Sequence, residues 1–228
     1  MLSLEGKRVL VTGGAVRLGR KMVEALQAEG ASVVVHANRS VDEAGALSSQ
    51  VVQGRLPEDI PAILAAAGPL DILINNAAVF RKDRLPESTP ERLHREFEVN
   101  LFAPLELIRL FAEQLEGRRG AVINIIDRRY RSLDPSCVPY LLSKKGLADL
   151  TRLAALEYAP RIQVNGVAPG PVLPPPNGSE IAREASGNLL LDHAPTPDDV
   201  ADTVLFLLKS SSITGEVICV DGGQHLIN

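Results

Sequence analysis

Cysteine and tryptophan are nearly absent from this sequence. Its 228 residues include no tryptophan and only two cysteines, Cys137 and Cys219, which lie far apart in the chain. Two such cysteines supply neither a disulfide framework nor the paired spacing of a zinc site, so we expect no metal centre. The absence of a disulfide framework is typical of the reducing cytoplasm, where we expect the protein to reside.

Excess positive charge and long apolar runs are also lacking. The chain has 24 Lys and Arg against 28 Asp and Glu, a net charge of −4. A nucleic-acid partner needs a basic footprint, so none is expected. No apolar run approaches the ~20 residues of a membrane span, and the first residues lack the pattern of a secretory signal, so no membrane partner is expected either. The length and the absence of repeats predict a single α/β domain over 1–228.

Short apolar runs alternate with amphipathic segments along the chain, which predicts parallel strands joined by helices. The predicted strands are 7–11, 31–36, 51–53, 70–74, 121–126, 162–167 and 216–220. The predicted helices are 20–29, 41–47, 57–67, 90–116, 137–158 and a last one that Thr196 caps and that ends at Lys209. In doubly wound sheets of this kind, ligands bind at the carboxyl ends of the strands.

The stretch 123–144 carries the clearest chemical signal. A buried-strand pattern leads into a polar loop with Asp127, and the next helix carries Tyr140 and Lys144. Residues four apart share one face of a helix, so the phenol and the ammonium can occupy one site. A neighbouring cation favours the phenolate, which predicts a Tyr140 pKa lowered from about 10 and a general acid that acts near neutral pH. The pair is common by chance and gains meaning only beside a dinucleotide site.

Such a site is predicted upstream. The turn Thr12–Gly19, with the sequence TGGAVRLG, joins the first strand to the first helix. Its glycines let the backbone approach a pyrophosphate, and the helix N-terminus offers N–H groups to an anion. After His36, the second strand leads into Asn38, Arg39 and Ser40, with no acid for a ribose 2′-hydroxyl. Arg39 and Ser40 suit a 2′-phosphate instead, which favours NADPH; an exposed loop arginine is the alternative.

Further short motifs complete the pattern: Asn75-Asn76-Ala77, Asn100 in FEVNLFAP, Pro169-Gly170 and Asp221-Gly222-Gly223. Together with the glycine turn and the Tyr/Lys pair, they make the whole chain resemble the short-chain dehydrogenase/reductase family, and within it the pteridine reductases most. The resemblance implies one Rossmann domain with a mostly parallel seven-stranded sheet in the order 3-2-1-4-5-6-7, helices on both faces, NADPH as the cofactor and a homotetramer.

The resemblance also assigns residues to roles. The catalytic group would be Asp127, Tyr140, Lys144 and Asn100, with Tyr140 giving the proton, Lys144 tuning it and Asn100 holding a water near Lys144. The substrate would contact Arg17, Phe80, Asp127 and Tyr140. The cofactor would contact Gly13, Arg17, Leu18, Gly19, His36, Asn38, Arg39, Ser40, Leu56, Asn76, Ala77, Ala78, Tyr140, Lys144, Pro169 and Gly170.

Three positions separate this chain from most of the family and match the pteridine reductases. Arg17 stands at the middle glycine of the turn, where a surface arginine is the alternative. Asp127 replaces the usual serine, where a capping residue is the alternative. Phe80 falls where pteridine reductases place a ring over the pterin, so a flat heterocycle could stack between Phe80 and the nicotinamide; a core phenylalanine is the alternative.

Other departures are harder to interpret. Arg55 replaces the usual acid at the adenine edge, which leaves the adenine contact open apart from packing by Leu56. The segment 169–194 carries PPPNG after its Pro-Gly pair and is predicted to be the substrate loop or lid, with a short helix. Arg128, Arg129 and Arg131 could steer an anionic substrate tail such as a glutamate, although a solvated basic loop is the favoured interpretation.

The predicted activity is NADPH-dependent reduction of a dihydropterin or dihydrofolate to the tetrahydro form. Asp127 suits a C=N target, because ring N–H and amino donors need acceptors, whereas a ketone mainly needs a donor. One alternative is a carbonyl reductase, such as a 3-oxoacyl thioester reductase, which shares every cofactor motif. An alternative of another class is a non-catalytic nucleotide-binding protein. The sequence leaves open which pterin or folate is used.

Overall fold

A single sheet of parallel strands forms the centre of the molecule. The computed structural model describes residues 3–173 and 189–227. Within them the strands follow the order β3-β2-β1-β4-β5-β6-β7, and every neighbouring pair is parallel, which confirms the predicted fold. The strands are β1 (Arg8–Val11), β2 (Ser32–Ala37), β3 (Val51–Gln53), β4 (Ile72–Asn75), β5 (Gly120–Ile125), β6 (Ile162–Pro169) and β7 (Val217–Val220).

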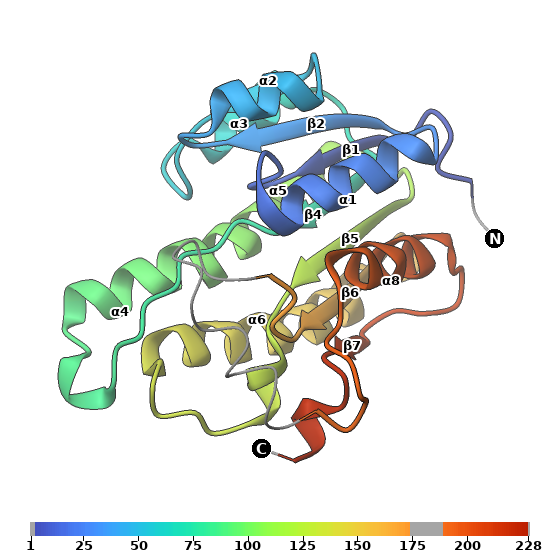
Figure 1. Ribbon diagram of the computed structural model, residues 1–228. Helices are drawn as coiled ribbons and strands as arrows, with labels where there is room; N and C mark the ends of the chain where they lie inside the picture. Colours follow the sequence, from blue (N-terminus) through green and yellow to red (C-terminus); the bar gives the residue numbers. More distant parts are fainter. Residues whose placement is uncertain (1–2, 174–188, 228) are drawn as a thin grey trace.

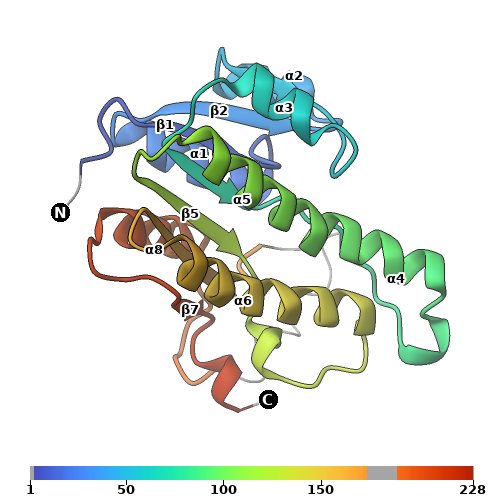
Figure 2. The same cartoon turned by 180° about the vertical axis from the view of Figure 1, so that it is seen from behind.

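Helices cover both faces of this sheet (Figures 1 and 2). One face lies under α1 (Arg17–Ala28), α2 (Val41–Leu47) and α8 (Pro197–Lys209). The other lies under α3 (Ile60–Ala67), α5 (Ala103–Gln114) and α6 (Val138–Tyr158). In Figure 2, α4 (Pro90–Phe97) and α5 follow one another beside α6. Among the described residues, no helix combines the length and the apolarity that a membrane crossing requires.

Side chains alternate along each strand between the two faces of the sheet, so each strand contributes to the apolar layers on both faces. Val11 and Ile74 pack on the α1 side, whereas the preceding residues, Leu10 and Leu73, pack on the α5 side. Successive strand residues point to opposite faces, so a strand buried on both faces must be apolar throughout. Each fully buried Leu, Ile or Val contributes roughly 1.5–3 kcal/mol, which makes these runs the main source of the fold's stability.

The predicted helix 90–116 is interrupted, which corrects the sequence analysis. Thr89 caps α4 by accepting the N–H of Arg92, but a π-helical segment, Glu98–Phe102, separates α4 from α5, and α5 ends at Gln114. Asn100 lies in this segment and is fully buried. Single π-helical turns often mark functional sites, and this one carries a predicted catalytic residue.

Three other helices begin at residues that differ from the prediction; α6 differs by one residue and begins at Val138, with Cys137 as its N-cap. Helix α1 begins at Arg17 rather than at residue 20, because the N–H of Arg20 already bonds to the carbonyl of Val16 at 3.2 Å. Helix α3 begins at Ile60 rather than at residue 57, because residues 56–59 form a turn in which Asp59 accepts the N–H of Arg55 at 2.8 Å. Most of the predicted lid, 174–188, lies outside the described residues.

Candidate active site

Two adjoining cavities open where the strands end. One has a volume of about 420 Å³ and the other about 610 Å³, and both are lined by Arg17, Leu18, Asn76 and Ala78. The first is lined by most of the predicted cofactor residues: Gly13, Arg17, Leu18, Gly19, His36, Asn38, Arg39, Ser40, Leu56, Asn76, Ala77 and Ala78. The second is lined by the remaining ones and by the predicted substrate residues: Arg17, Phe80, Asp127, Tyr140, Lys144, Pro169 and Gly170. Of all predicted site residues, Asn100 alone is absent from both linings.

The glycine turn brings backbone close to the first cavity. Gly13 has φ of 60°, and a Cβ on Gly19 would collide with the Gly13 carbonyl oxygen, so only glycine fits at position 19. The amide of Asn76 donates to the carbonyls of Thr12 (2.9 Å) and Gly13 (3.0 Å) and fixes the turn on the end of β4. Because the backbone of the turn lies so close to the N-terminus of α1, the backbone N–H groups there are suited to bind a pyrophosphate.

Arg17 occupies the turn in a left-handed conformation, with φ of 54°. Residues other than glycine rarely adopt this backbone conformation, because it costs of order 1–3 kcal/mol. Residues in such strained conformations cluster at functional sites. Glycine would adopt this conformation without that cost. Arg17 lines both cavities, so its cation lies where a cofactor and a substrate would meet.

His36 braces the turn from β2. Its Nδ1 accepts the N–H of Gly13 at 3.2 Å, which places the proton on Nε2, 3.1 Å from the carbonyl oxygen of Gly54. Burial lowers the pKa of His36, so the ring stays neutral in this role. His36 therefore supports the cofactor cavity as a hydrogen-bonding brace.

The residues that follow β2 are those predicted to bind the 2′-phosphate of the cofactor. Arg39 and Ser40 line the first cavity, and no acidic residue is among the described residues that line it. Arg55 is absent from the lining and lies near Asp59, with its Nε 4.0 Å from the carboxylate. Sequence reasoning missed Arg95, which lines the cavity and donates to the carbonyl of Leu56 at 3.3 Å.

Asp127, Tyr140 and Phe80 meet in the second cavity. The Tyr140 hydroxyl donates to Asp127 Oδ2 at 3.2 Å, and the Phe80 ring meets the Tyr140 ring edge to face, with centroids 4.7 Å apart. Phe80 is 48% exposed, which excludes the core-phenylalanine interpretation. Asp127 also accepts the N–H of Arg129 at 2.8 Å, so it caps the short helix Arg128–Arg131 as well as facing the tyrosine.

The pKa of Tyr140 contradicts the prediction. Burial first, and then the charge of Asp127, raise the Tyr140 pKa well above 10, although a lowering by Lys144 was expected. The Lys144 ammonium instead donates to the carbonyl of Ile125 at 2.7 Å, and burial lowers its own pKa to about 8. Burial and the carboxylate bonded to the hydroxyl therefore outweigh the opposing charge of Arg129, and Tyr140 retains its proton.

Asn100 lies behind the cavities, where it anchors the segment after β4. Its Oδ1 accepts the N–H of Val79 at 2.9 Å, and its Nδ2 donates to the Val79 carbonyl at 2.9 Å and to Glu96 Oε2 at 2.8 Å. It also lies 3.1 Å from the Ser143 hydroxyl. Its predicted role as the holder of a water near Lys144 remains a prediction.

Glu96 is a functional candidate that sequence reasoning missed. Its side chain is buried, and burial raises its pKa to about 7 despite the hydrogen bond from Asn100. The one available signal was its position four residues before Asn100, on the same helical face. A buried carboxyl whose pKa is near neutrality and that contacts a predicted catalytic residue is a candidate for a functional role in the site.

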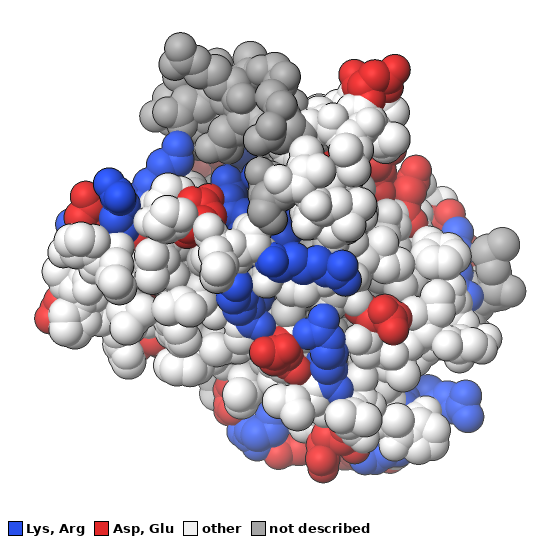
Figure 3. Space-filling view, turned by 90° about the horizontal axis from the view of Figure 1, so that it is seen from below, with Lys and Arg blue, Asp and Glu red and all other residues white. Residues whose placement is uncertain are grey.

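Lys and Arg side chains gather across the middle of the face that lies at the bottom of Figure 1, with acidic ones among them (Figure 3). Of the three predicted basic residues, Arg128 and Arg129 line the second cavity, whereas Arg131 donates to the Tyr130 hydroxyl at 2.8 Å. Lys82, which sequence reasoning missed, lines the second cavity too. Arg128 and Arg129 are therefore half-buried residues of the cavity lining, whereas Arg131 is exposed.

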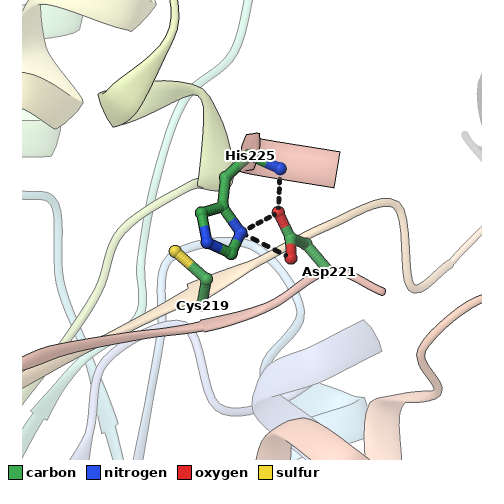
Figure 4. Close-up of side chains that lie close together, drawn as sticks. All are labelled: Cys219, Asp221 and His225. Atoms are coloured by element: carbon green, nitrogen blue, oxygen red, sulfur yellow. Dashed lines mark hydrogen bonds and ion pairs between the residues drawn. The ribbon is translucent and has the colours of Figure 1, made fainter. Parts of the chain in front are cut away.

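A separate group of side chains lies near the end of the chain (Figure 4). In the part of the chain that is described, potential ligand atoms of Cys219, Asp221 and His225 lie within 4.8 Å of one another. The Asp221 carboxylate accepts the N–H groups of Gly223 and His225 and, at 2.9 Å, the Nδ1–H of His225. Because these donors engage both oxygens, we interpret the group as a clamp that packs the turn against Gly170, where a Cβ would lie 2.9 Å from Asp221 Cα.

Comparisons with known proteins found several reductases that are similar to this chain. Residues 14–225 match the family model described as Enoyl-(Acyl carrier protein) reductase. The L-xylulose reductase of Bos taurus is 34% identical, over 97% of this chain and 98% of its own. Two crystal structures of FolM alternative dihydrofolate reductase 1 are each 37% identical to this chain. The Brucella canis structure, complexed with NADP, has a TM-score of 0.92 and is matched over 99% of this chain and 96% of its own. The Brucella suis structure, also in complex with NADP, has a TM-score of 0.91, over 100% and 98%.

Proposed function

The chain belongs to the short-chain dehydrogenase/reductase family and is an oxidoreductase of that type, and we propose that it uses NADPH to reduce a dihydropterin or dihydrofolate to the tetrahydro form. The observation that carries the proposal is the Asp127–Tyr140 hydrogen bond in a cavity walled by Phe80. An aromatic wall suits a flat heterocycle, and a carboxylate suits its ring N–H and amino donors.

The first cavity fits NADPH by its own residues. Gly13 and Gly19 bring backbone to the N-terminus of α1, which suits a pyrophosphate, and Arg39 with Ser40 suits a 2′-phosphate. Bound there, NADPH would supply a hydride to the substrate ring. The shared lining of Arg17, Leu18, Asn76 and Ala78 supports placing its nicotinamide end toward the second cavity.

Each catalytic residue then has a task that its contacts support. Tyr140 holds a proton at its hydroxyl and donates it to the ring nitrogen next to the carbon that accepts the hydride. Asp127 keeps this proton on Tyr140 and orients the pterin. Lys144 supplies positive charge behind Tyr140 and binds the nicotinamide ribose, and Asn100 fixes the segment that presents Phe80.

A carbonyl reductase is the second candidate, because the 34% identical relative is an L-xylulose reductase. A ketone oxygen gains negative charge during reduction and needs a donor beside it. Asp127 would place a carboxylate at that point and oppose the developing charge. The chemistry of the site therefore favours a pterin substrate, whereas the similarity to an L-xylulose reductase favours a sugar substrate.

The test is NADPH consumption with four substrates side by side: dihydrofolate, dihydrobiopterin, L-xylulose and an acetoacetyl thioester. We expect turnover with at least one of the first two and little or none with the others. Turnover of only the carbonyl substrates would establish the second candidate. Binding of NADPH without any turnover would point to a non-catalytic nucleotide-binding protein.

We further propose that the protein is a cytoplasmic homotetramer built of a single domain, in which 169–194 serves as the substrate loop. Apolar side chains on the α4–α5 and α6 layer are exposed, and such patches mark interaction surfaces. They are Leu93, Phe102, Leu105, Leu142, Leu153 and Leu156. Light scattering at micromolar concentration should report four chains, and a monomer would contradict the assembly.

A further inference from the structure

Phe80, whose ring would stack on the substrate, lies in a segment without secondary structure. Residues 76–84, between β4 and the short helix Leu85–Glu87, form neither helix nor strand. The backbone on either side of Phe80 therefore lacks the hydrogen bonds of a helix or a sheet. The ring is 48% exposed, so packing surrounds it incompletely. Its position must depend on side chains that hold this backbone.

Asn100 and Glu96 hold the backbone on the two sides of Phe80. The Val79 N–H donates to Oδ1 of Asn100, and Nδ2 of Asn100 donates to the Val79 carbonyl, both at 2.9 Å. On the other side, the backbone N–H of Arg81 forms a hydrogen bond with the Glu96 carboxylate. Glu96 is 1% exposed and Asn100 is 0% exposed, so these contacts are shielded from water.

The amide of Asn100 can hold Val79 in one orientation only. A flipped amide would place its oxygen against the Val79 carbonyl and its NH2 group against the Val79 N–H, and both hydrogen bonds would be lost. Glu96 selects the productive orientation, because its Oε2 accepts from Nδ2 of Asn100 at 2.8 Å. Oε1 of Glu96 has no hydrogen-bond partner among the described residues. When the carboxyl is neutral, its proton can sit on Oε1, so Oε2 accepts in either charge state.

The same amide connects the segment of Phe80 to the helix of Tyr140. Nδ2 of Asn100 donates to the Ser143 hydroxyl at 3.1 Å, and this hydroxyl donates to the Tyr140 carbonyl at 2.7 Å. Phe80 and Tyr140 line the second cavity, whereas Glu96 does not. Glu96 therefore lies behind the cavity, one hydrogen bond away from the residues that fix the two rings.

We propose that Glu96 is a positioning residue, which orients Asn100 and holds Arg81 so that the Phe80 ring stays where it stacks on the pterin. This inference rests on the proposed function, because the stacked pterin is part of it. The position requires a buried hydrogen-bond acceptor and not a negative charge. Glutamine supplies that acceptor through its amide oxygen, whereas leucine, of similar size, supplies none.

Kinetics at saturating NADPH compare Glu96→Leu, Glu96→Gln and Glu91→Leu, a control that removes an exposed carboxyl from the same helix. We expect Glu96→Leu to raise KM for dihydrofolate or dihydrobiopterin about two- to tenfold, the effect of one lost hydrogen bond, and to leave KM for NADPH unchanged. Glu96→Gln should retain most of the wild-type KM. In a Phe80→Ala background, Glu96→Leu should change KM by less than about twofold, because the ring through which it acts is gone.

Fluorescence tests the positioning without any substrate. The chain contains no tryptophan, so Phe80→Trp introduces a single reporter, at an exposed position with room for the larger ring. Addition of Glu96→Leu to this variant should lower the fluorescence anisotropy and increase quenching by acrylamide. Addition of Glu96→Gln should largely preserve both values. Thermal unfolding checks that each variant is folded, and Glu96→Met, with a weak acceptor only, replaces Glu96→Leu if that variant does not fold.

Three results would overturn the role of Glu96. They are an unchanged reporter in Glu96→Leu, an equal change in Glu96→Gln, and a rise in KM that persists in the Phe80→Ala background. Each of them leaves the pterin chemistry intact. A wild type that reduces neither dihydrofolate nor dihydrobiopterin would overturn the proposed function, and the tryptophan reporter would still decide whether Glu96 positions residue 80.

Discussion

Replacement of Glu96 by glutamine should change how stability depends on pH. Glu96 is buried behind the active site, and burial raises its pKa from 4.5 to about 7. A raised carboxyl pKa means that the folded state binds the proton more tightly than the unfolded state does. The resulting stability is fully present below pH 4.5 and is lost as the pH rises through 7, because the buried side chain must then carry a charge.

The magnitude follows from the interval between the two pKa values. Each pKa unit corresponds to 1.36 kcal/mol, so the change from 4.5 to about 7 corresponds to about 3 kcal/mol of stability between pH 4.5 and pH 8. Glutamine cannot ionise, and its amide oxygen can still accept the hydrogen bond from Asn100. Glu96→Gln should therefore gain about 2–3 kcal/mol relative to the wild type between pH 5 and pH 8.

Urea unfolding at pH 5, 6, 7 and 8 measures this gain as the difference in unfolding free energy between variant and wild type. The matched control is Glu157→Gln on α6, which removes an exposed carboxyl. Its difference from the wild type should stay nearly constant with pH. A constant difference for Glu96→Gln would refute the reasoning, because it would mean that Glu96 does not titrate in this range in the folded protein.

Three further predictions concern the site itself. Wild type should prefer NADPH to NADH, and equal use of both cofactors by the wild type would contradict this. Arg39→Ala should weaken NADPH binding by about ten- to a hundredfold with little effect on NADH, since a charge-assisted contact contributes roughly 1.5–3 kcal/mol. Tyr140→Phe should lower turnover about 10²–10⁴-fold while fluorescence titration shows nearly unchanged NADPH binding, because the ring stays and only the proton is lost; a largely retained rate would make Asp127 the first suspect for the acid. Phe80→Ala should weaken pterin binding by about 1–3 kcal/mol, the value of a lost base–aromatic stack, and unchanged KM values would exclude the stacking role.

Much of the fold could be predicted from local pattern alone. Strands such as Arg8–Val11 and Ile72–Asn75 are buried on both faces, so their continuous apolar runs stand out between polar loops. The order of the strands came from the family resemblance. The interruption at Glu98–Phe102 could not be foreseen, because a π-helical turn leaves no periodic signal and depends on the partners that Asn100 finds in the folded protein.

Site residues could be predicted from the sequence where their role follows from their position relative to a strand or helix. Arg39 and Ser40 follow the end of β2 after one residue, and Tyr140 and Lys144 share a helical face, so the fold alone brings each pair to its cavity. The pKa of Tyr140 was not predictable, because its direction depends first on the burial of the hydroxyl and then on which charged neighbour contacts it. Spacing identified the cation four residues away, whereas the folded chain brought the carboxylate of Asp127 to 3.2 Å.

Lys82 and Arg95 were missed for a related reason. Each belongs to a segment without a motif, and only the tertiary structure brings it to a cavity wall. Isolated charged residues are usually solvated, so no sequence feature separates these two from the other 22 of the 24 Lys and Arg in the chain.

The central claim is that Asp127 adapts a family reductase to a pterin, and Asp127→Ser tests it most directly. The measurement is kcat/KM at saturating NADPH for dihydrofolate, dihydrobiopterin and L-xylulose, for wild type and variant. The variant keeps a polar side chain at the end of β5 but removes the carboxylate that accepts from Tyr140 and from the pterin. We predict that it loses most pterin and folate reduction, by more than it loses NADPH binding, and that it gains a trace of ketone reduction. A variant that reduces dihydropterins as well as the wild type does would contradict the account and favour a carbonyl reductase.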